Sequence, residues 1–139
     1  MAVTATPIFP QVIKNAVVTL NNASASTVTT LYTAGTNGSK IENLLVTSTD
    51  TSARDIWLYW VISATNYQIG TVTIPVTSGT VNSAPTVNLL NSTNLPGFAK
   101  DANGNPYLYL ASGTALSVAA ATTITSGKQI QFITQGGDY

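Results

Sequence analysis

The sequence contains no cysteine and no histidine, and only 7% of its 139 residues are charged. The missing cysteine excludes disulfides, thiol nucleophiles and thiolate metal sites, and the missing histidine removes the most frequent general base and metal ligand. Five basic and five acidic residues give a formal net charge of zero, whereas an average soluble domain has roughly 25% charged residues. The surface must therefore consist largely of Thr, Ser, Asn and Gln. Because a neutral surface gives little repulsion between molecules, this composition suits a protein that works packed against other proteins.

The positions of the charges and the lengths of the apolar runs indicate which partners to expect. The five basic residues lie singly along the chain, at Lys14, Lys40, Arg54, Lys100 and Lys128. No basic patch is predicted that could release counterions from phosphates, so we expect no nucleic-acid partner. No run approaches the roughly 18 apolar residues of a membrane span, and the start "MAVTATPIFP" lacks the basic and long apolar regions of a signal peptide. We therefore expect no membrane partner and synthesis in a cytoplasm.

Segments that alternate between apolar and polar residues predict an all-β protein. They are rich in Val, Ile, Thr and Tyr, they are separated by Gly, Asn, Ser and Pro, and no segment has a convincing helical pattern. The predicted strands are 15–20, 27–33, 40–49, 54–65, 67–76, 86–90, 107–112, 115–122 and 128–134. Eight or nine short antiparallel strands indicate a single-domain β-sandwich or jelly roll.

Turn residues and prolines mark the connections. The Asn-Gly pairs in 36–40 and 101–106 favour tight reversals, because both residues tolerate positive φ. Pro75 has no N–H for a ladder, so its strand is predicted to lie at a sheet edge or to carry a bulge. The segment 78–106 contains three further prolines and is predicted to be a long surface connection with one strand in it.

The two ends of the chain depart from this pattern. Residues 1–14 are predicted to form an extended arm, because prolines flank Ile8 and Phe9 without alternation, and residues 15–139 are predicted to form the domain. The two apolar side chains favour contact with a neighbour; alternatively, the arm is a terminal strand of its own domain. The final "QGGDY" is predicted to be a frayed tail or a small docking tag that ends in Tyr139.

The segment "RDIWLYWVIS" (54–63) is apolar on both faces of a predicted strand. One face is assigned to the core, and its side chains are Ile56, Leu58, Trp60 and Ile62. The other face carries Trp57, Tyr59 and Val61, where a one-layer antiparallel sheet would show water a polar face. We expect a partner subunit to cover it, since exposed Trp and Tyr are typical of interface hot spots. The alternative is that the segment 78–106 or the arm folds over it.

No catalytic constellation is predicted. The ionisable residues leave only a two-carboxylate glycosidase arrangement, for which Asp50 and Asp55 flank one loop. Both stand where a β-turn favours Asp, and Asp55 beside Arg54 is typical of a solvated strand end. We therefore expect no enzyme activity, no catalytic residue and no cofactor.

The motif "DANGN" has a metal-binding interpretation beside a structural one. Asp101, Asn103 and Asn105 place oxygen donors at alternate positions, as at the start of a calcium loop. Ser112 stands where that loop would need Glu. We interpret the motif as a tight turn and predict no metal site; a weak cation site is the alternative.

Five aromatic residues suggest a stacking platform for sugar rings, and they are Trp57, Tyr59, Tyr67, Tyr107 and Tyr109. Tyr107 and Tyr109 alternate with two leucines, however, so one of these pairs must be core, and aromatic residues are ordinary strand formers. Core packing plus a protein interface is the preferred interpretation. A carbohydrate-binding β-sandwich module is the alternative.

Two segments, "GSKIENLLVTSTDTSARDIWLYWV" (38–61) and "LPGFAKDANGNPYLYLASGTALSVAAATTITSGKQIQFITQGGDY" (95–139), together resemble small virion proteins of tailed bacteriophages. The order of "TDTSAR", the aromatic strand, "DANGNPY", "TSGK" and the terminal "GGDY" is similar to that in cement or decoration proteins of phage heads. The similarity extends from about residue 38 onward, and its landmarks are structural rather than chemical.

The resemblance implies a jelly-roll domain that forms a homodimer and binds the major capsid protein across seams on the outside of the head. It implies a structural virion protein, made in the host cytoplasm, that stabilises the shell. Related modules also occur in tail and fibre parts, where the carbohydrate-binding alternative would apply. The predicted interface residues rest on the apolar pattern alone, and they are Ile8, Phe9, Trp57, Tyr59, Val61 and Tyr139.

Overall fold

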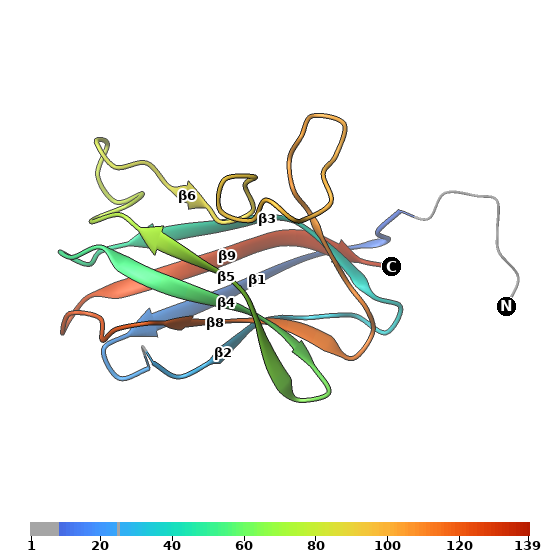
Figure 1. Ribbon diagram of the computed structural model, residues 1–139, viewed down its shortest axis with the longest axis horizontal. Coiled ribbons are helices and arrows are strands. Elements are labelled where there is room, and N and C mark those ends of the chain that lie inside the picture. The colour runs from blue at the N-terminus through green and yellow to red at the C-terminus, as the bar shows by residue number, and fades with distance from the viewer. Residues whose placement is uncertain (1–8, 25) are drawn as a thin grey trace, which may run out of the picture.

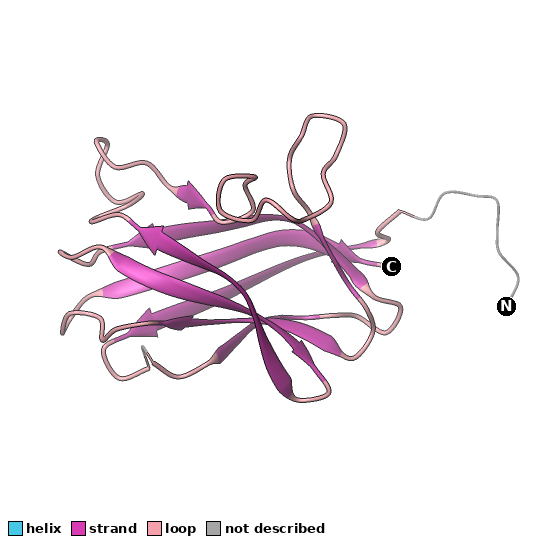
Figure 2. Cartoon of the chain, viewed as in Figure 1, coloured by secondary structure: helices cyan, strands magenta, loops and turns pink. Residues whose placement is uncertain are grey.

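The fold is all-β, as the sequence predicts, and it is a sandwich of two antiparallel sheets (Figures 1 and 2). The computed structural model describes residues 9–24 and 26–139, and this part of the chain contains no helix. The first sheet has the order β1 (Val12–Asn21), β9 (Gln129–Asp138), β3 (Ser39–Ser48) and β6 (Val87–Asn88), with β7 (Leu108–Leu110) also paired to β3. The second sheet has the order β2 (Thr29–Thr33), β8 (Thr114–Ala120), β4 (Arg54–Ile62) and β5 (Thr65–Ile74).

The core lies between the two sheets and is built from alternate residues of the strands. In β4, Ile56 and Leu58 are fully buried, while Trp57 between them faces outward. Burial of such apolar side chains is the main stabilising term, at roughly 25 cal/mol per Å². The largest fully buried side chains are Tyr32, Phe132, Leu20, Ile41, Leu44, Ile56, Leu58, Ile74, Leu89, Leu90, Leu95 and Leu108.

Each of the predicted strands is present, and the differences lie at their ends. β1 begins at Val12 rather than at residue 15, so residues 12–14, which were assigned to the arm, pair with β9. β9 continues to Asp138, so the expectation of a frayed tail is wrong for most of "QGGDY". A Cβ atom on Gly136 would collide with the carbonyl oxygen of Lys40 in β3. The absence of a side chain at Gly136 therefore lets β9 lie close to β3, and flexibility is not its role.

The segment 78–106 is more than the surface connection that the sequence predicts. It includes β6, as expected, but its Leu89, Leu90 and Leu95 are buried in the core. Leu95 reaches β5, where its Cδ2 atom lies 2.6 Å from the position that a Cβ on Gly70 would occupy. The segment thus closes the core between β3 and β5, and Figure 1 draws it in yellow and orange beside β3. The prediction missed this because the polar run between the leucines has no regular period.

Two other expectations about the connections are confirmed. Pro75 directly follows β5, which lies at the edge of the second sheet and has a register shift opposite Leu58 and Tyr59. Gly38 and Gly104 of the two Asn-Gly pairs have φ values of 90° and 82°. Both glycines therefore adopt a backbone conformation that other residues rarely adopt.

Closure of the core by Leu95 gives a first test. Leu95→Ala removes an almost fully buried side chain, and we expect it to lower the free energy of unfolding by about 2–5 kcal/mol through lost burial and the cavity left behind. Val81→Ala changes an exposed residue of the same segment and should stay within about 0.5 kcal/mol. Chemical denaturation measures both effects. Equally small effects would show that the segment does not close the core.

Candidate interaction surfaces

The outward face of the second sheet carries the aromatic row that the sequence singles out. Trp57, Tyr59 and Val61 lie on β4 between β8 and β5, and all three are partly buried. In the pairing of β4 with β8, Trp57 lies opposite Ala119 and Tyr59 lies opposite Ser117. Both β8 residues are almost fully buried although they alternate with the core residues of their strand. The large rings beside them therefore cover the small residues of β8.

This pairing partly explains what covers the second apolar face of β4. Part of this face is covered by its own large side chains, which lie next to the small residues of β8 and pack over them. The segment 78–106, which was one alternative cover, closes the core between β3 and β5 instead. The arm, the other alternative, lies mostly outside the described residues. The parts of the three side chains that stay exposed remain the predicted interface.

Trp60 and Ile62, both predicted to lie on the inner face of β4, differ in burial. Trp60 packs against the core, and its indole Nε1 is the one buried side-chain nitrogen or oxygen without a hydrogen-bond partner among the residues described. Ile62 is exposed, so its assignment to the core is wrong. β4 extends past the core at this point, into a turn in which Ser63 and Ala64 have positive φ values of 49° and 62°.

The outward face of the first sheet carries a second apolar row, which the sequence analysis missed. Val17 of β1 lies opposite Ile133 of β9, and Ile133 lies opposite Leu45 of β3. The exposed fractions are 62% for Val17 and 36% for Ile133, and Ile13 on the same strand as Val17 reaches 88%. Val17, Ile133 and Leu45 form an apolar row that crosses three strands.

Uncharged polar side chains border this apolar row on both sides. The bordering rows are Asn15, Gln135 and Asn43, and Thr19, Gln131 and Thr47. The Asn43 amide donates to Gln135 Oε1 at 3.2 Å, so part of one border is already hydrogen-bonded. The three central rows of this face therefore carry no charged side chain.

The signal for this face was present in the sequence. Ile13, Asn15, Val17 and Thr19 are spaced two residues apart, so a strand places all four on one face. The predicted strand began at residue 15, which left Ile13 in the arm and hid the length of the pattern.

The six predicted interface residues do not form one surface. Ile8 lies outside the described residues. Phe9 is 73% exposed just before β1, and the N–H of Tyr139 donates to the carbonyl oxygen of Gly38 directly after β9. Phe9 and Tyr139 thus belong to one end of the first sheet, whereas the other three lie on the second sheet.

The five residues of the suggested saccharide platform are also divided. Trp57, Tyr59 and Tyr67 belong to β4 and β5, whereas Tyr107 and Tyr109 lie at β7 in the other sheet. The two leucines that alternate with the last pair are the core residues of β7. No single platform therefore combines all five rings.

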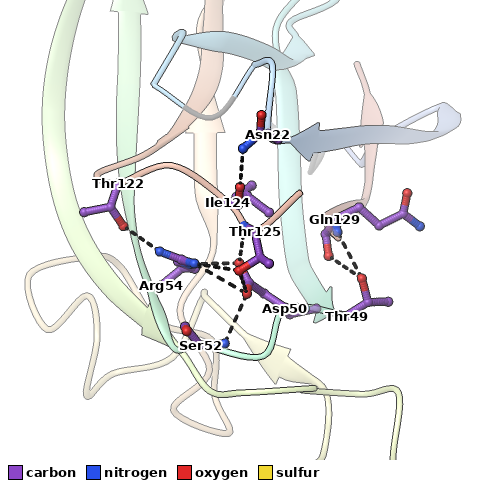
Figure 3. A network of polar contacts seen from close by, with 10 residues as sticks. Asn22, Thr49, Asp50, Ser52, Arg54, Thr122, Ile124, Thr125 and Gln129 are labelled. Atoms are coloured by element: carbon purple, nitrogen blue, oxygen red, sulfur yellow. Dashed lines mark hydrogen bonds and ion pairs between the residues drawn. The ribbon is translucent and has the colours of Figure 1, made fainter. Parts of the chain in front are cut away.

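Asp50 is the buried ionic centre of one end of the sandwich (Figure 3). Its carboxylate pairs with Arg54, whose Nε lies 2.8 Å from Oδ2. It also accepts hydrogen bonds from the Thr125 hydroxyl at 2.7 Å, the Thr125 N–H at 3.1 Å and the Ser52 N–H at 3.1 Å. The backbone carbonyl of Asp50 accepts from the N–H of Thr77 at 3.1 Å. One residue thereby joins the β3–β4, β5–β6 and β8–β9 connections.

These contacts set the protonation state of Asp50. Burial by itself favours the neutral carboxyl, but the hydrogen bonds from Arg54, Thr125 and Ser52 outweigh it and hold the pKa of Asp50 well below its ordinary value. Asp55, by contrast, is exposed and accepts a hydrogen bond from the Thr73 hydroxyl at 2.6 Å. Asp50 lies in the β3–β4 connection, as the turn interpretation predicts, whereas Asp55 lies within β4, so its placement in a turn is wrong. The solvated strand end at Asp55 is confirmed, but Arg54 pairs with Asp50. No local pattern around Asp50 indicated that its side chain is buried.

A second polar cluster holds the opposite end of the sandwich. Asp138 at the end of β9 accepts hydrogen bonds from the hydroxyls of Tyr32, at 3.0 Å, and Ser39, and Lys14 Nζ lies 3.3 Å from its Oδ2. Burial raises the pKa of Tyr32 to about 12. Because these residues come from β1, β2, β3 and β9, the chain segment that was expected to fray is tied to three other strands.

Asp101 closes the tight turn that "DANGN" predicts. Its Oδ1 accepts hydrogen bonds from the N–H groups of Asn103 at 2.9 Å and Asn105 at 2.8 Å. The N–H groups of Asn105 and Asn103 lower the pKa of this carboxyl. The Asp101 carboxylate is thus hydrogen-bonded within the turn that contains it. In the part of the chain that the structure describes, no three His, Cys, Asp or Glu side chains gather in a way that could hold a metal ion.

Asp50 provides a stability test with a defined pH dependence. We expect Asp50→Asn to lower the free energy of unfolding by about 3–5 kcal/mol at neutral pH, because Arg54 loses its buried partner. The folded-state pKa is depressed, so this stabilisation is present above the unfolded value of about 4 and is lost as the pH falls toward the folded pKa. The difference between wild type and variant should therefore shrink below about pH 4 in a denaturation series.

Asp55→Asn is the matched control for this test. Asp55 is exposed, and the hydrogen bond that its carboxylate accepts from Thr73 should contribute at most about 1 kcal/mol. If Asp50→Asn were as stable as Asp55→Asn, the structural role of the buried ion pair would be contradicted.

A comparison with models of known protein families found no match, and a comparison with curated protein sequences found none either. Within the described ranges, no helix is long and apolar enough to cross a membrane. The outward faces of the two sheets and the side chains at the ends of the sandwich are therefore the features from which a function can be inferred.

Proposed function

We propose that this protein is a structural component that binds other proteins through the apolar rows on the outward faces of its two sheets, and more narrowly that it is a cement protein on a bacteriophage head. The observation that carries the proposal is the presence of an apolar row on each outward face. These rows are Trp57, Tyr59 and Val61 on β4, and Val17, Ile133 and Leu45 across β1, β9 and β3. The resemblance of residues 38–61 and 95–139 to phage virion proteins supports the narrower part.

Uncharged faces of this kind are suited to lasting contacts with protein. A charged side chain that enters an interface loses hydration, and only a well-placed partner compensates for that loss. The first sheet avoids this cost, because its apolar row is bordered by amide and hydroxyl side chains. An apolar centre with a polar rim is the usual arrangement of a protein interface.

Two faces on opposite sides of one sandwich allow a single copy to contact two neighbours. In the proposed role one face contacts the major capsid protein and the other contacts a second copy, which gives a homodimer on the outer surface of the virion. A dimer that engages two subunits of a repeating lattice gains binding strength from effective concentration. Because such a ligand binds only the assembled shell, it opposes the opening of that shell.

The jelly-roll connectivity implied by the resemblance belongs to the same proposal. The nested strand order supports it, because the first strand pairs with the last in one sheet and the second strand pairs with the second-last in the other. Jelly rolls are built from two packed sheets of this wrapped kind.

Two double variants test the faces separately. Trp57→Ser with Tyr59→Ser removes the row on the second sheet, and Val17→Ser with Ile133→Ser removes the row on the first sheet. We expect both proteins to stay folded. One should lose self-association in sedimentation velocity and the other should lose co-sedimentation with phage heads, each by at least about thirtyfold in affinity, as expected for hot spots worth about 2 kcal/mol.

Tyr67→Ser is the matched control, because Tyr67 is an exposed aromatic residue of β5 that belongs to neither row. If both double variants fold and associate like the wild type, the docking faces are wrongly assigned. If the wild type self-associates but does not bind heads, the cement role fails while the docking faces stand.

A further inference from the structure

Three tyrosine rings follow one another at one end of the first sheet. The ring centres of Tyr107 and Tyr109 lie 5.0 Å apart at an interplanar angle of 71°, and those of Tyr109 and Tyr139 lie 6.5 Å apart. Tyr109 is part of β7, while Tyr107 and Tyr139 lie next to the ends of β7 and β9. Both strands pair with β3, so the sheet itself sets the spacing of these rings. We call these three residues the tyrosine row.

A hollow of about 620 Å³ opens at the Tyr139 end of the tyrosine row. Among the described residues, its lining consists of Tyr109, Tyr139, Gln11 and Asn37, and all four of these side chains are uncharged. The Asn37 amide donates to the backbone carbonyl oxygen of Tyr139 at 3.3 Å, which places this amide at the edge of the hollow. Tyr109 is 52% exposed in spite of its two aromatic neighbours. The hollow therefore combines an open aromatic surface with amide donors and acceptors.

A second hollow of about 270 Å³ lies at the Tyr107 end of the row. Besides Tyr107 and Pro106 it is lined by Lys40, Glu42, Asn43, Asn88, Asp101 and Asn105. Lys40 Nζ lies 4.8 Å from the centre of the Tyr107 ring and 2.9 Å from Glu42 Oε1. The lysine charge is thus paired within the hollow, which presents a mixture of hydrogen-bond donors and acceptors.

We propose that the tyrosine row and its two hollows form a binding site for a neutral oligosaccharide. A sugar ring has an apolar face of C–H groups that packs on an aromatic ring, and its hydroxyls both donate and accept hydrogen bonds. The tyrosine row supplies successive rings, and the hollows supply amide, carboxylate and ammonium groups for the hydroxyls. The tyrosine row lies at one end of the first sheet and includes none of the residues of the two apolar rows. The proposed sugar site is therefore separate from the proposed docking faces.

The same observations disfavour two other ligand classes. An anionic ligand would need free positive charge, but none of the described residues that line the larger hollow is charged, and Lys40 is paired with Glu42. A peptide that added to the sheet as a further strand would need a longer free edge, and β7 offers only three residues. A short neutral glycan matches both the open rings and the mixed polar groups.

The test uses the full chain on an array of neutral oligosaccharides built from glucose, galactose, mannose, xylose and N-acetylglucosamine, followed by NMR titration with the strongest hit. We expect that hit to shift the backbone amide signals of Asn37 and of residues 107–110. Tyr109→Ala should weaken its binding at least about tenfold. Asn37→Ala, which removes only the amide, should weaken binding with the rings intact.

Tyr67→Ala is the matched control, since Tyr67 is 53% exposed, like Tyr109, but lies on β5. It should leave the affinity unchanged, and unaltered thermal unfolding of all three variants excludes misfolding as the cause. Silence across the array, or an equal loss in Tyr109→Ala and Tyr67→Ala, would overturn the proposal. Binding of a proline-rich peptide to the row, with no oligosaccharide bound, would overturn it in favour of a protein ligand. None of these outcomes depends on whether the protein binds phage heads.

Discussion

The buried ion pair between Asp50 and Arg54 is the contact on which the arrangement of the two sheets depends most. A carboxylate removed from water is stable only when its oxygens are fully hydrogen-bonded, and Asp50 meets this requirement with Arg54, Thr125 and Ser52. The pair joins the end of β3 in one sheet to the start of β4 in the other, and Thr125 brings in the connection to β9. Arg54 is the first residue of β4, so the pair also holds the strand whose outward side chains include Trp57.

In the described part of the chain, the ion pairs lie toward the ends of the sandwich, and the central rows of each outward face carry no charged side chain. Asp50 and Arg54 hold one end, while Lys14 and Asp138 hold the other. Between these ends, apolar rows cross the sheets with Thr, Asn, Gln and small residues around them. A domain with tied ends and neutral faces can pack against other proteins at little desolvation cost, which is the physical basis of the proposed structural role.

Local patterns predicted the strands, whereas contacts between distant residues decided the surfaces. The alternation around Ile56 and Leu58 and the Asn-Gly pairs act within a few residues, and both predictions are confirmed. The burial of Leu95 depends on Gly70, which lies in another part of the chain, so no local period announced it. The sequence named Tyr107 and Tyr109 as possible stacking residues but did not join Tyr139 to them, since Tyr139 meets Tyr109 only when β9 and β7 both pair with β3. Which side chains meet on a surface depends on the pairing of distant strands, and the alternation within one strand does not reveal that pairing.

The central claim, that this chain is a structural component of a phage particle, is tested most directly by its copy number in purified particles from its source. Quantitative mass spectrometry would measure the chain relative to the major shell protein in the same sample. A cement protein bound across the lattice predicts an abundance comparable to that of the shell protein. Absence of the chain from particles that contain the shell protein would contradict the claim.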